Sequence, residues 1–217
     1  GYLWRFDGSN WVSYYLPDSY ISSIAFDEMG NKWLGLTDAG IAKFDGTNFT
    51  VFNTGNSDIP SNWATTIAVD KIGNKWIGTA GGGLAKFDGV NWTTYNTSNS
   101  GLPDNYIYSV AIDGSGNKWI GTANGLTKFD GNTWTTYNAS NSGLQSNGAS
   151  SILIDAVGNI WMASGGLTKF DGTNFTTYNT SNSGLASNQV SSIAIDGHGN
   201  KWIGSNYSGL SVYNEIG

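Results

Sequence analysis

The phrase "GNKWIGT" at Gly73–Thr79 decides the fold of this chain, because the chain repeats it. The other copies are "GNKWLGL" at Gly30–Leu36, "GNKWIGT" at Gly116–Thr122, "GNIWMAS" at Gly158–Ser164 and "GNKWIGS" at Gly199–Ser205. A second phrase, "FDG", begins at Phe6, Phe44, Phe87, Phe129 and Phe170. A period near 40 residues with only short strand-like runs is typical of the blades of a β-propeller.

Each period divides into four predicted strands, A to D. In the third copy these are Tyr108–Asp113, Lys118–Thr122, Leu126–Phe129 and Thr133–Tyr137. The Asp-Gly pair between strands C and D is a strong hairpin signal, because glycine adopts the positive φ of a tight turn. No segment has a helical period. The sequence therefore predicts an all-β fold, a five-bladed β-propeller with four antiparallel strands per blade.

The order of the strands suggests how the propeller closes. We expect one domain over residues 1–217, with blades at about 20–53, 64–96, 107–138, 149–179 and 190–214 plus 1–15. The N-terminal strand D, Trp11–Tyr15, is predicted to complete the C-terminal blade. Two strand C candidates, Leu3–Phe6 and Leu210–Tyr213, then compete for one place. Either one is displaced, or the chain is part of a longer propeller.

The repeated side chains have structural interpretations. Strand A alternates large and small residues, as in Ile67-Ala68-Val69, which predicts that both of its faces are buried between blades. The tryptophan of each "GNxW" phrase is predicted to pack as a wedge between blades. The aspartates of the "DxxGN" and "FDG" turns are predicted to accept hydrogen bonds from nearby backbone amides.

Composition excludes several functions. The net charge is −6, and nine of the ten cations occupy repeated positions, so no basic patch for nucleic acid is expected. The chain has no cysteine and one histidine, His198, in a variable turn. We therefore expect no metal, no cofactor and no nucleophile–base pair. Calcium needs about six to eight oxygen ligands, and each "DxxGN" turn offers one carboxylate. No apolar run is long enough for a membrane span, and we expect a monomer.

The pattern of Gly101–Asp130, "GLPxN…DxxGNxWIGT…GLxxFDG", resembles the two-component regulator propeller repeats of bacterial proteins. The resemblance covers nearly the whole chain. It implies a propeller that belongs to an extracytoplasmic sensor region, often one that responds to carbohydrate. Related repeats also occur in secreted surface proteins. The resemblance alone therefore implies a periplasmic, cell-surface or secreted location.

A candidate binding site remains when the repeat is subtracted. Four aspartates lie outside the repeated turns: Asp18, Asp38, Asp58 and Asp104. Just before strand A, the first three copies carry an aromatic residue where the last two carry Gly148 and Gln189. The connections D–A and B–C emerge on one face of a propeller, so these residues should share that face. The predicted ligand-binding residues are Tyr20, Trp63, Tyr106, Asp18, Asp38, Asn62, Asp104 and Asn105.

Three functions are compatible with these candidate binding residues. The first is a non-catalytic module that binds a glycan or another polar ligand, as a sensor or adhesion protein. The second is a structural or protein-interaction scaffold, with a multivalent lectin that binds sugar equally between all blades as a variant. The third is a glycosidase or lyase that uses Asp38 with Asp58 or Asp104. We predict no enzymatic activity, because the loops offer no other acid or base.

Overall fold

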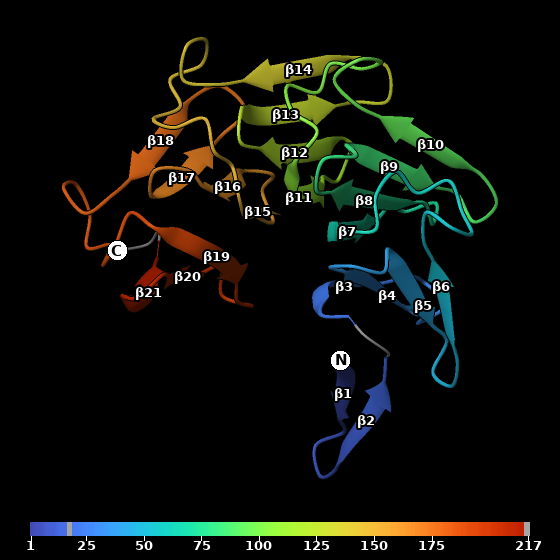
Figure 1. Ribbon diagram of the computed structural model, residues 1–217. Helices are drawn as coiled ribbons and strands as arrows, with labels where there is room; N and C mark the ends of the chain where they lie inside the picture. The colour runs from blue at the N-terminus through green and yellow to red at the C-terminus, as the bar shows by residue number, and fades with distance from the viewer. Residues whose placement is uncertain (17–18, 215–217) are drawn as a thin grey trace. The chain divides into compact units, whose positions relative to one another are not determined.

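The structure is a computed structural model that describes residues 1–16 and 19–214, and these residues form strands and turns but no helix. None of the described residues belongs to a helix that could cross a membrane. Its contacts divide the chain into two compact units, Gly1–Tyr95 and Asn96–Gly217, called unit 1 and unit 2. Figure 1 labels the strands of both.

Unit 1 contains a hairpin and two four-stranded sheets, whose strands pair in chain order. The hairpin is β1 (Tyr2–Phe6) and β2 (Trp11–Tyr15). Blade 1 is β3 (Ile21–Phe26), β4 (Lys32–Leu36), β5 (Ile41–Phe44) and β6 (Phe49–Phe52). Blade 2 is β7 (Ala64–Val69), β8 (Lys75–Thr79), β9 (Leu84–Phe87) and β10 (Trp92–Tyr95).

Unit 2 contains three sheets with the same order of strands. Blade 3 is β11 (Ile107–Ile112), β12 (Lys118–Thr122), β13 (Gly125–Phe129) and β14 (Trp134–Tyr137). Blade 4 is β15 (Ile152–Ile154), β16 (Ile160–Ala163), β17 (Leu167–Phe170) and β18 (Phe175–Tyr178). Blade 5 is β19 (Val190–Ile195), β20 (Lys201–Ser205) and β21 (Gly209–Tyr213).

These sheets are propeller blades. Every pair of neighbouring strands in a sheet is antiparallel, and each blade follows the previous one along the chain. The turn aspartates act as predicted: Asp130, for example, accepts hydrogen bonds from the amides of Asn132 and Thr133, both at 2.8 Å. Gly131 beside it has φ +110°, which a side chain would disfavour. The predicted fold class, a five-bladed all-β propeller, is confirmed.

The predicted completion of the last blade by the N-terminal strand joins two different units and stays a prediction. Trp11–Tyr15 (β2) pairs with β1, from Phe6↔Trp11 to Tyr2↔Tyr15. In the described part of the chain blade 5 has three strands, and β21 pairs with β20. Both strand C candidates therefore keep their own partner. The physical reason is local: a short Asp7-Gly8 turn joins β1 to β2, so this pairing closes a much shorter loop than a pairing with the far end of the chain.

The repeated tryptophan packs between neighbouring blades within each unit, as predicted. In unit 2, Trp161 is fully buried and lies 5.6 Å from the ring of Tyr213 in blade 5. Two cations also lie over its ring, the Nζ of Lys169 at 5.4 Å and that of Lys201 at 4.5 Å from the centroid. Burial of the ring and cation–π attraction both stabilise the contact between these blades.

The "DxxGN" aspartate does more than the sequence indicated. In all five repeats its Oδ2 accepts the indole N–H of the tryptophan six residues later, at 2.9–3.0 Å. The same carboxylate accepts the side-chain amide of the repeat asparagine, as from Asn159 to Asp155 at 2.8 Å. The turn therefore fixes the orientation of the buried indole.

Strand A of blade 1 departs from the expectation that both of its faces are buried. Ile24 and Phe26 are 47% and 64% exposed. The hairpin in front of blade 1 supplies only strands of type C and D, and its Leu3 packs in the cluster of Leu34 and Phe44 on blade 1. Within unit 1 this half-blade packs on the outer part of blade 1 and supplies no strand beside strand A.

One glycine of the "WIG" phrase marks a close approach between blades. A Cβ on Gly121 would lie 2.0 Å from the carbonyl oxygen of Ala149 in blade 4. At the same position of blade 5, a Cβ on Gly204 would meet the Oγ of Ser192 at 2.6 Å, and a hydroxyl can rotate away whereas a backbone cannot. We expect Gly121→Ala to lower the free energy of unfolding by about 1–3 kcal/mol, as for other overpacked sites.

Gly204→Ala is the matched control, and urea denaturation measures both variants. It should cost clearly less than Gly121→Ala, because only the Ser192 side chain must move. Equal losses for the two variants would show that the approach of Gly121 to Ala149 does not limit the packing of blades 3 and 4.

Candidate functional site

In unit 1 the loops that enter strand A meet the loops between strands B and C, as predicted. The amide of Thr37 donates to the carbonyl of Tyr20 at 3.1 Å, and the amide of Gly40 donates to the carbonyl of Asn62 at 2.7 Å. The amide of Ala80 donates to the carbonyl of Trp63 at 2.9 Å. These bonds place four predicted site residues on one surface, which we call the unit 1 loop surface: Tyr20, Asp38, Asn62 and Trp63.

The unit 1 loop surface presents aromatic side chains to solvent. Tyr20 is 79% exposed and Trp63 is 48% exposed, and neither belongs to the clusters around Trp33 and Leu34 of unit 1. Asp38 is exposed and accepts the hydroxyl of Thr37 at 3.3 Å. Asp58 is also exposed, in the loop that leads to blade 2. Asp18, the remaining predicted residue of this part of the chain, lies outside the described residues.

The predicted asparagines hold their own loops. The Oδ1 of Asn62 accepts the amide of Thr54, and that of Asn105 accepts the amide of Thr97, both at 2.8 Å. The equivalent bond forms in the next two loops, to Asn147 and Asn188. This asparagine therefore has a structural role in every long D–A loop, and its carbonyl oxygen is engaged there.

The other predicted residues, Asp104, Asn105 and Tyr106, belong to unit 2. Asp104 accepts the amide of Tyr106 at 2.8 Å and the side-chain amide of Asn124 at 3.0 Å. In the second, fourth and fifth repeats a serine performs the first of these roles, as Ser187 does for the amide of Gln189. Asp104 is therefore a turn residue that also ties the D–A loop to the B–C loop.

Sequence reasoning missed an aromatic partner of Tyr106. The ring of Tyr108 lies 5.1 Å from that of Tyr106, and the two side chains are 38% and 36% exposed. Tyr108 sits at an irregularity in the pairing of β11 with β12, between Ile107 and Ser109. Such bulges turn a side chain out of the regular alternation. A usable signal was present, because the other repeats carry serine or threonine at this position: Ser22, Thr65, Ser150 and Ser191.

A second missed aromatic is Tyr207, in the B–C loop of blade 5. It is fully exposed, and at φ 64° it is the only non-glycine residue with positive φ among those described. A bulky residue rarely adopts this conformation, and such strain often accompanies function. The amide of neighbouring Asn206 donates to the carbonyl of Gln189, so this loop meets a D–A loop like the others.

The described residues offer no group of three His, Cys, Asp or Glu side chains that could hold a metal. His198 is exposed in its turn, and its amide donates to Asp196 at 2.9 Å. The loop surfaces therefore combine exposed aromatic rings with single carboxylates and amides. Such an arrangement can stack on an apolar patch of a ligand and exchange hydrogen bonds with its hydroxyl groups.

The chain is similar in fold to solved bacterial structures. The extracellular domain of a hybrid two-component system, BT3049 from B. thetaiotaomicron, matches with TM-score 0.78 and 23% identity, over 92% of this chain and 29% of that one. PorZ, a surface component of the type-IX secretion system of Porphyromonas gingivalis, matches with TM-score 0.70 and 19% identity, over 92% and 32%. This chain thus spans about a third of either protein.

A streptogramin B lyase matches with TM-score 0.68 and 18% identity, over 92% of this chain and 70% of that chain. At these identities the similarity shows the fold alone. No curated protein matches the sequence.

A family model described as the two component regulator propeller matches residues 101–124. These residues run from the end of a D–A loop to the B–C loop of blade 3, and they include the phrase at Gly116–Thr122. The other four blades carry the same phrase. The chain is therefore a β-propeller in which one stretch, residues 101–124, matches the model of the two component regulator propeller.

Proposed function

We propose that this chain is a non-catalytic binding module that recognises a neutral glycan, or a similar polar ligand, through the unit 1 loop surface. The observation that supports this proposal is the exposure of Tyr20 and Trp63 at a position where blades 4 and 5 carry Gly148 and Gln189. The fold does not require an aromatic residue there. An exposed tryptophan exposes apolar area to water, which binding to a sugar face would cover.

Each group of the surface has a role in this proposal. Tyr20 and Trp63 stack on the C–H faces of sugar rings. Asp38 accepts hydrogen bonds from hydroxyl groups. In unit 2, the paired rings of Tyr106 and Tyr108 beside Asp104 offer a second surface of the same chemistry.

We place the module outside the cytoplasm, as part of a sensor or adhesion protein. Two similar solved structures support this location: one is an extracellular domain of a two-component system and the other a bacterial surface component. The chain has no cysteine, so its fold depends on no disulfide, and this is compatible with a location outside the cytoplasm.

A structural or protein-interaction scaffold is the second candidate. It is supported by the long D–A loops, which satisfy their own polar groups: Asn99 accepts the amide of Asn96, and Asn96 accepts the amide and hydroxyl of Ser98. Loops of this kind suit a spacer. The multivalent lectin variant predicts one sugar per gap between blades, so binding stoichiometry separates it from a single site.

We expect Trp63→Ala to weaken glycan binding by at least about tenfold, the change that corresponds to 1.4 kcal/mol. Its effect on the free energy of unfolding should stay below about 1 kcal/mol, as for surface substitutions. A glycan array with the full chain identifies the ligand, and calorimetric titration with that ligand measures affinity and stoichiometry.

Gln189→Ala, at the same repeat position of blade 5, is the control and should leave binding unchanged. No retained glycan on the array, or equal affinity of Trp63→Ala and the unchanged chain, would reject the unit 1 loop surface. Turnover of a bound polysaccharide that Asp38→Asn abolishes would instead show an enzyme.

A further inference from the structure

The B–C loop of blade 5 carries a tyrosine where its backbone favours glycine. This loop, "SNYSGL" at Ser205–Leu210, has the same length as the B–C loop of blade 2, "TAGGGL" at Thr79–Leu84. Tyr207 has φ 64°, and the residue at its position in blade 2 is Gly81, with φ 85°. A bulky side chain is strained in this backbone conformation, whereas glycine adopts it freely. Backbone conformation alone would therefore select glycine at this position.

The side chain of Tyr207 makes no contact that would offset this strain. It is fully exposed, and it forms no hydrogen bond or ring contact with another described residue. This exposure belongs to the loop position and not to the end of the repeat array. Asp38 occupies the same position in blade 1 and is exposed, although the amide of Gly40 bonds to the carbonyl of Asn62 in the loop that enters blade 2. The position therefore faces solvent even where another blade follows.

The base of the same loop holds a hydroxyl group without a partner. The Oγ of Ser205 is buried, and it forms no hydrogen bond within the described part of the chain. In the loop of equal length in blade 2, the Oγ1 of Thr79 donates to the carbonyl of Gly83 at 2.7 Å. In blade 4, the Oγ of Ser164 donates to the carbonyl of Ser146 at 2.9 Å. Buried hydroxyl groups are normally paired, so the loop of blade 5 departs from its counterparts in a second, independent way.

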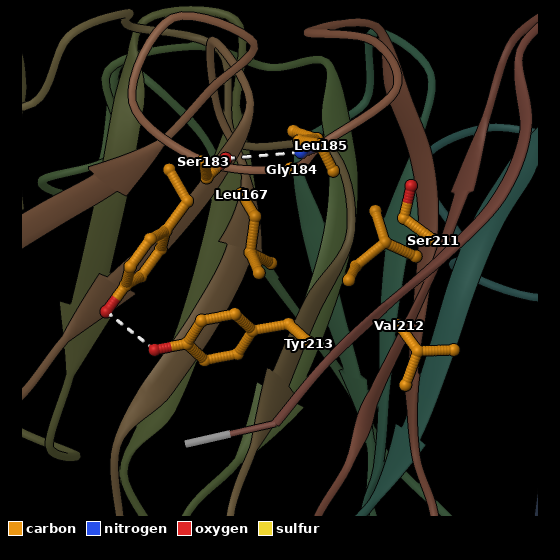
Figure 2. A pocket seen from close by; sticks show the side chains of 9 residues that line it. Leu167, Ser183, Gly184, Leu185, Ser211, Val212 and Tyr213 are labelled. Atoms are coloured by element: carbon orange, nitrogen blue, oxygen red, sulfur yellow. Dashed lines mark hydrogen bonds between the residues drawn. The ribbon is translucent and has the colours of Figure 1, made fainter. Parts of the chain in front are cut away.

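The D–A loop that supports Tyr207 is anchored in the core of unit 2. Leu185 belongs to the same buried cluster as Leu167, and its amide donates to the hydroxyl of Ser183 at 3.3 Å, as Figure 2 shows. Four residues after Leu185, the carbonyl of Gln189 accepts the amide of Asn206 at 3.0 Å. The cavity of about 90 Å³ that this loop borders is small beside ligand pockets of about 300–1,000 Å³. A ligand of blade 5 therefore has room at the loop surface and not beneath it.

The surface around Tyr207 is polar and uncharged. Neither the B–C loop, at residues 205–210, nor the D–A loop, at residues 179–189, contains Asp, Glu, Lys or Arg. Asn206 and Ser208, on either side of the tyrosine in the chain, are exposed. An aromatic ring can stack on the C–H face of a sugar, while an amide and a hydroxyl exchange hydrogen bonds with its hydroxyl groups. A charged ligand would have no counter-ion in these loops, so the chemistry favours a neutral sugar.

We propose that Asn206, Tyr207 and Ser208 form a second sugar-binding site, on the B–C loop of blade 5, for one ring of a neutral glycan. The tyrosine stacks on the sugar, and the neighbouring amide and hydroxyl bond to its hydroxyl groups. Backbone strain of this kind persists where a side chain is needed for function. The site rests on the proposed function, because its ligand is of the same class, but it uses no residue of the unit 1 loop surface.

Calorimetric titration with a neutral oligosaccharide that the glycan array retains tests the second site. The unchanged chain should bind two equivalents, and Trp63→Ala should keep the one at blade 5. Tyr207→Gly, added to Trp63→Ala, should weaken this remaining binding at least about tenfold, which corresponds to 1.4 kcal/mol. Tyr207→Phe is the matched variant: it retains the ring and should keep most of the affinity. In urea, Tyr207→Gly should unfold at the same or a higher concentration than the unchanged chain, because glycine relieves the strain.

The two sites can fail separately. One equivalent per chain, lost in Trp63→Ala and unaffected by Tyr207→Gly, would overturn the second site and leave the unit 1 loop surface supported. Binding that Tyr207→Gly removes and Trp63→Ala leaves unchanged would support the second site and reject the first. An array that retains no neutral oligosaccharide would reject both. A loss in Tyr207→Phe as large as in Tyr207→Gly, or a lower urea midpoint for Tyr207→Gly, would also overturn the second site.

Discussion

Trp161→Ala is expected to lower the free energy of unfolding by about 3–5 kcal/mol, the range found for buried tryptophans truncated to alanine. The indole is fully buried between blade 4 and blade 5. Its removal leaves a cavity next to Tyr178 and Tyr213. It also leaves Lys201, which is only 3% exposed, without the ring beneath its ammonium group. Urea denaturation followed by circular dichroism measures the loss.

Trp202→Ala provides the matched control, because Trp202 occupies the same repeat position in blade 5 and is 39% exposed. It forms the same bond to its aspartate, at 3.0 Å. The cost of this substitution should be well below that of Trp161→Ala, since less apolar area returns to water. Similar losses in the two variants would mean that the wedge between blades contributes little beyond the indole–aspartate bond.

The repeat made the fold predictable. Each blade carries its own hairpin turns, its alternating strands and its tryptophan, so local signals and the overall architecture agree. The five-fold recurrence fixed the number of blades and nearly all strand limits. The sequence left open only the pairing at the ends of the repeat array. There the sequence offers two strands of the same type, and their choice depends on loop length, not on side-chain pattern.

The site was less predictable because subtraction of the repeat identifies unusual residues but not their contacts. It identified Tyr20 and Trp63, which are exposed, and the hydrogen bonds of Thr37 and Gly40 bring Asp38 and Asn62 to the same surface. It could not reveal that Asn62 holds its own loop, because that bond spans eight residues of irregular chain.

Two aromatic residues escaped the same reasoning. Tyr108 was assigned to the regular part of strand A, where the bulge turns it outward. Tyr207 lies in a loop whose strained backbone is visible only in the structure. Both would have been found by comparing every loop position across the five copies instead of the position before strand A alone.

Acid is expected to destabilise the chain through the five "DxxGN" aspartates. The pKa of Asp155 lies below its ordinary value of 3.8. Partial burial raises this pKa, but the hydrogen bonds from Trp161, Asn159 and the amide of Val157 together lower it by more. The pKa values of Asp27, Asp70 and Asp113 are lowered in the same way. A carboxyl group whose pKa is lower in the folded state contributes stability that is fully present above its unfolded pKa and is lost as the pH falls through the folded value.

Asp155→Asn tests this contribution at one blade. At pH 7 the variant should lose about 2 kcal/mol of unfolding free energy, because hydrogen bonds to a charged acceptor contribute roughly 1.5–3 kcal/mol and this carboxylate is partly solvated. Its unfolding free energy should also fall less than that of the unchanged chain between pH 6 and about pH 2.5, since one proton-binding group is gone. Urea denaturation at each pH gives both quantities.

Asp171→Asn removes the same charge from the exposed "FDG" turn of blade 4, where the carboxylate accepts the backbone amides of Thr173 and Asn174 and bonds to no indole. It should cost less at pH 7, because no buried indole loses its acceptor. If Asp171→Asn proves as harmful as Asp155→Asn, the loss reflects charge alone. The bond between Asp155 and Trp161 would then not be what orients the wedge. If instead only Asp155→Asn is harmful, each blade depends on one carboxylate to hold the tryptophan that packs it against the next.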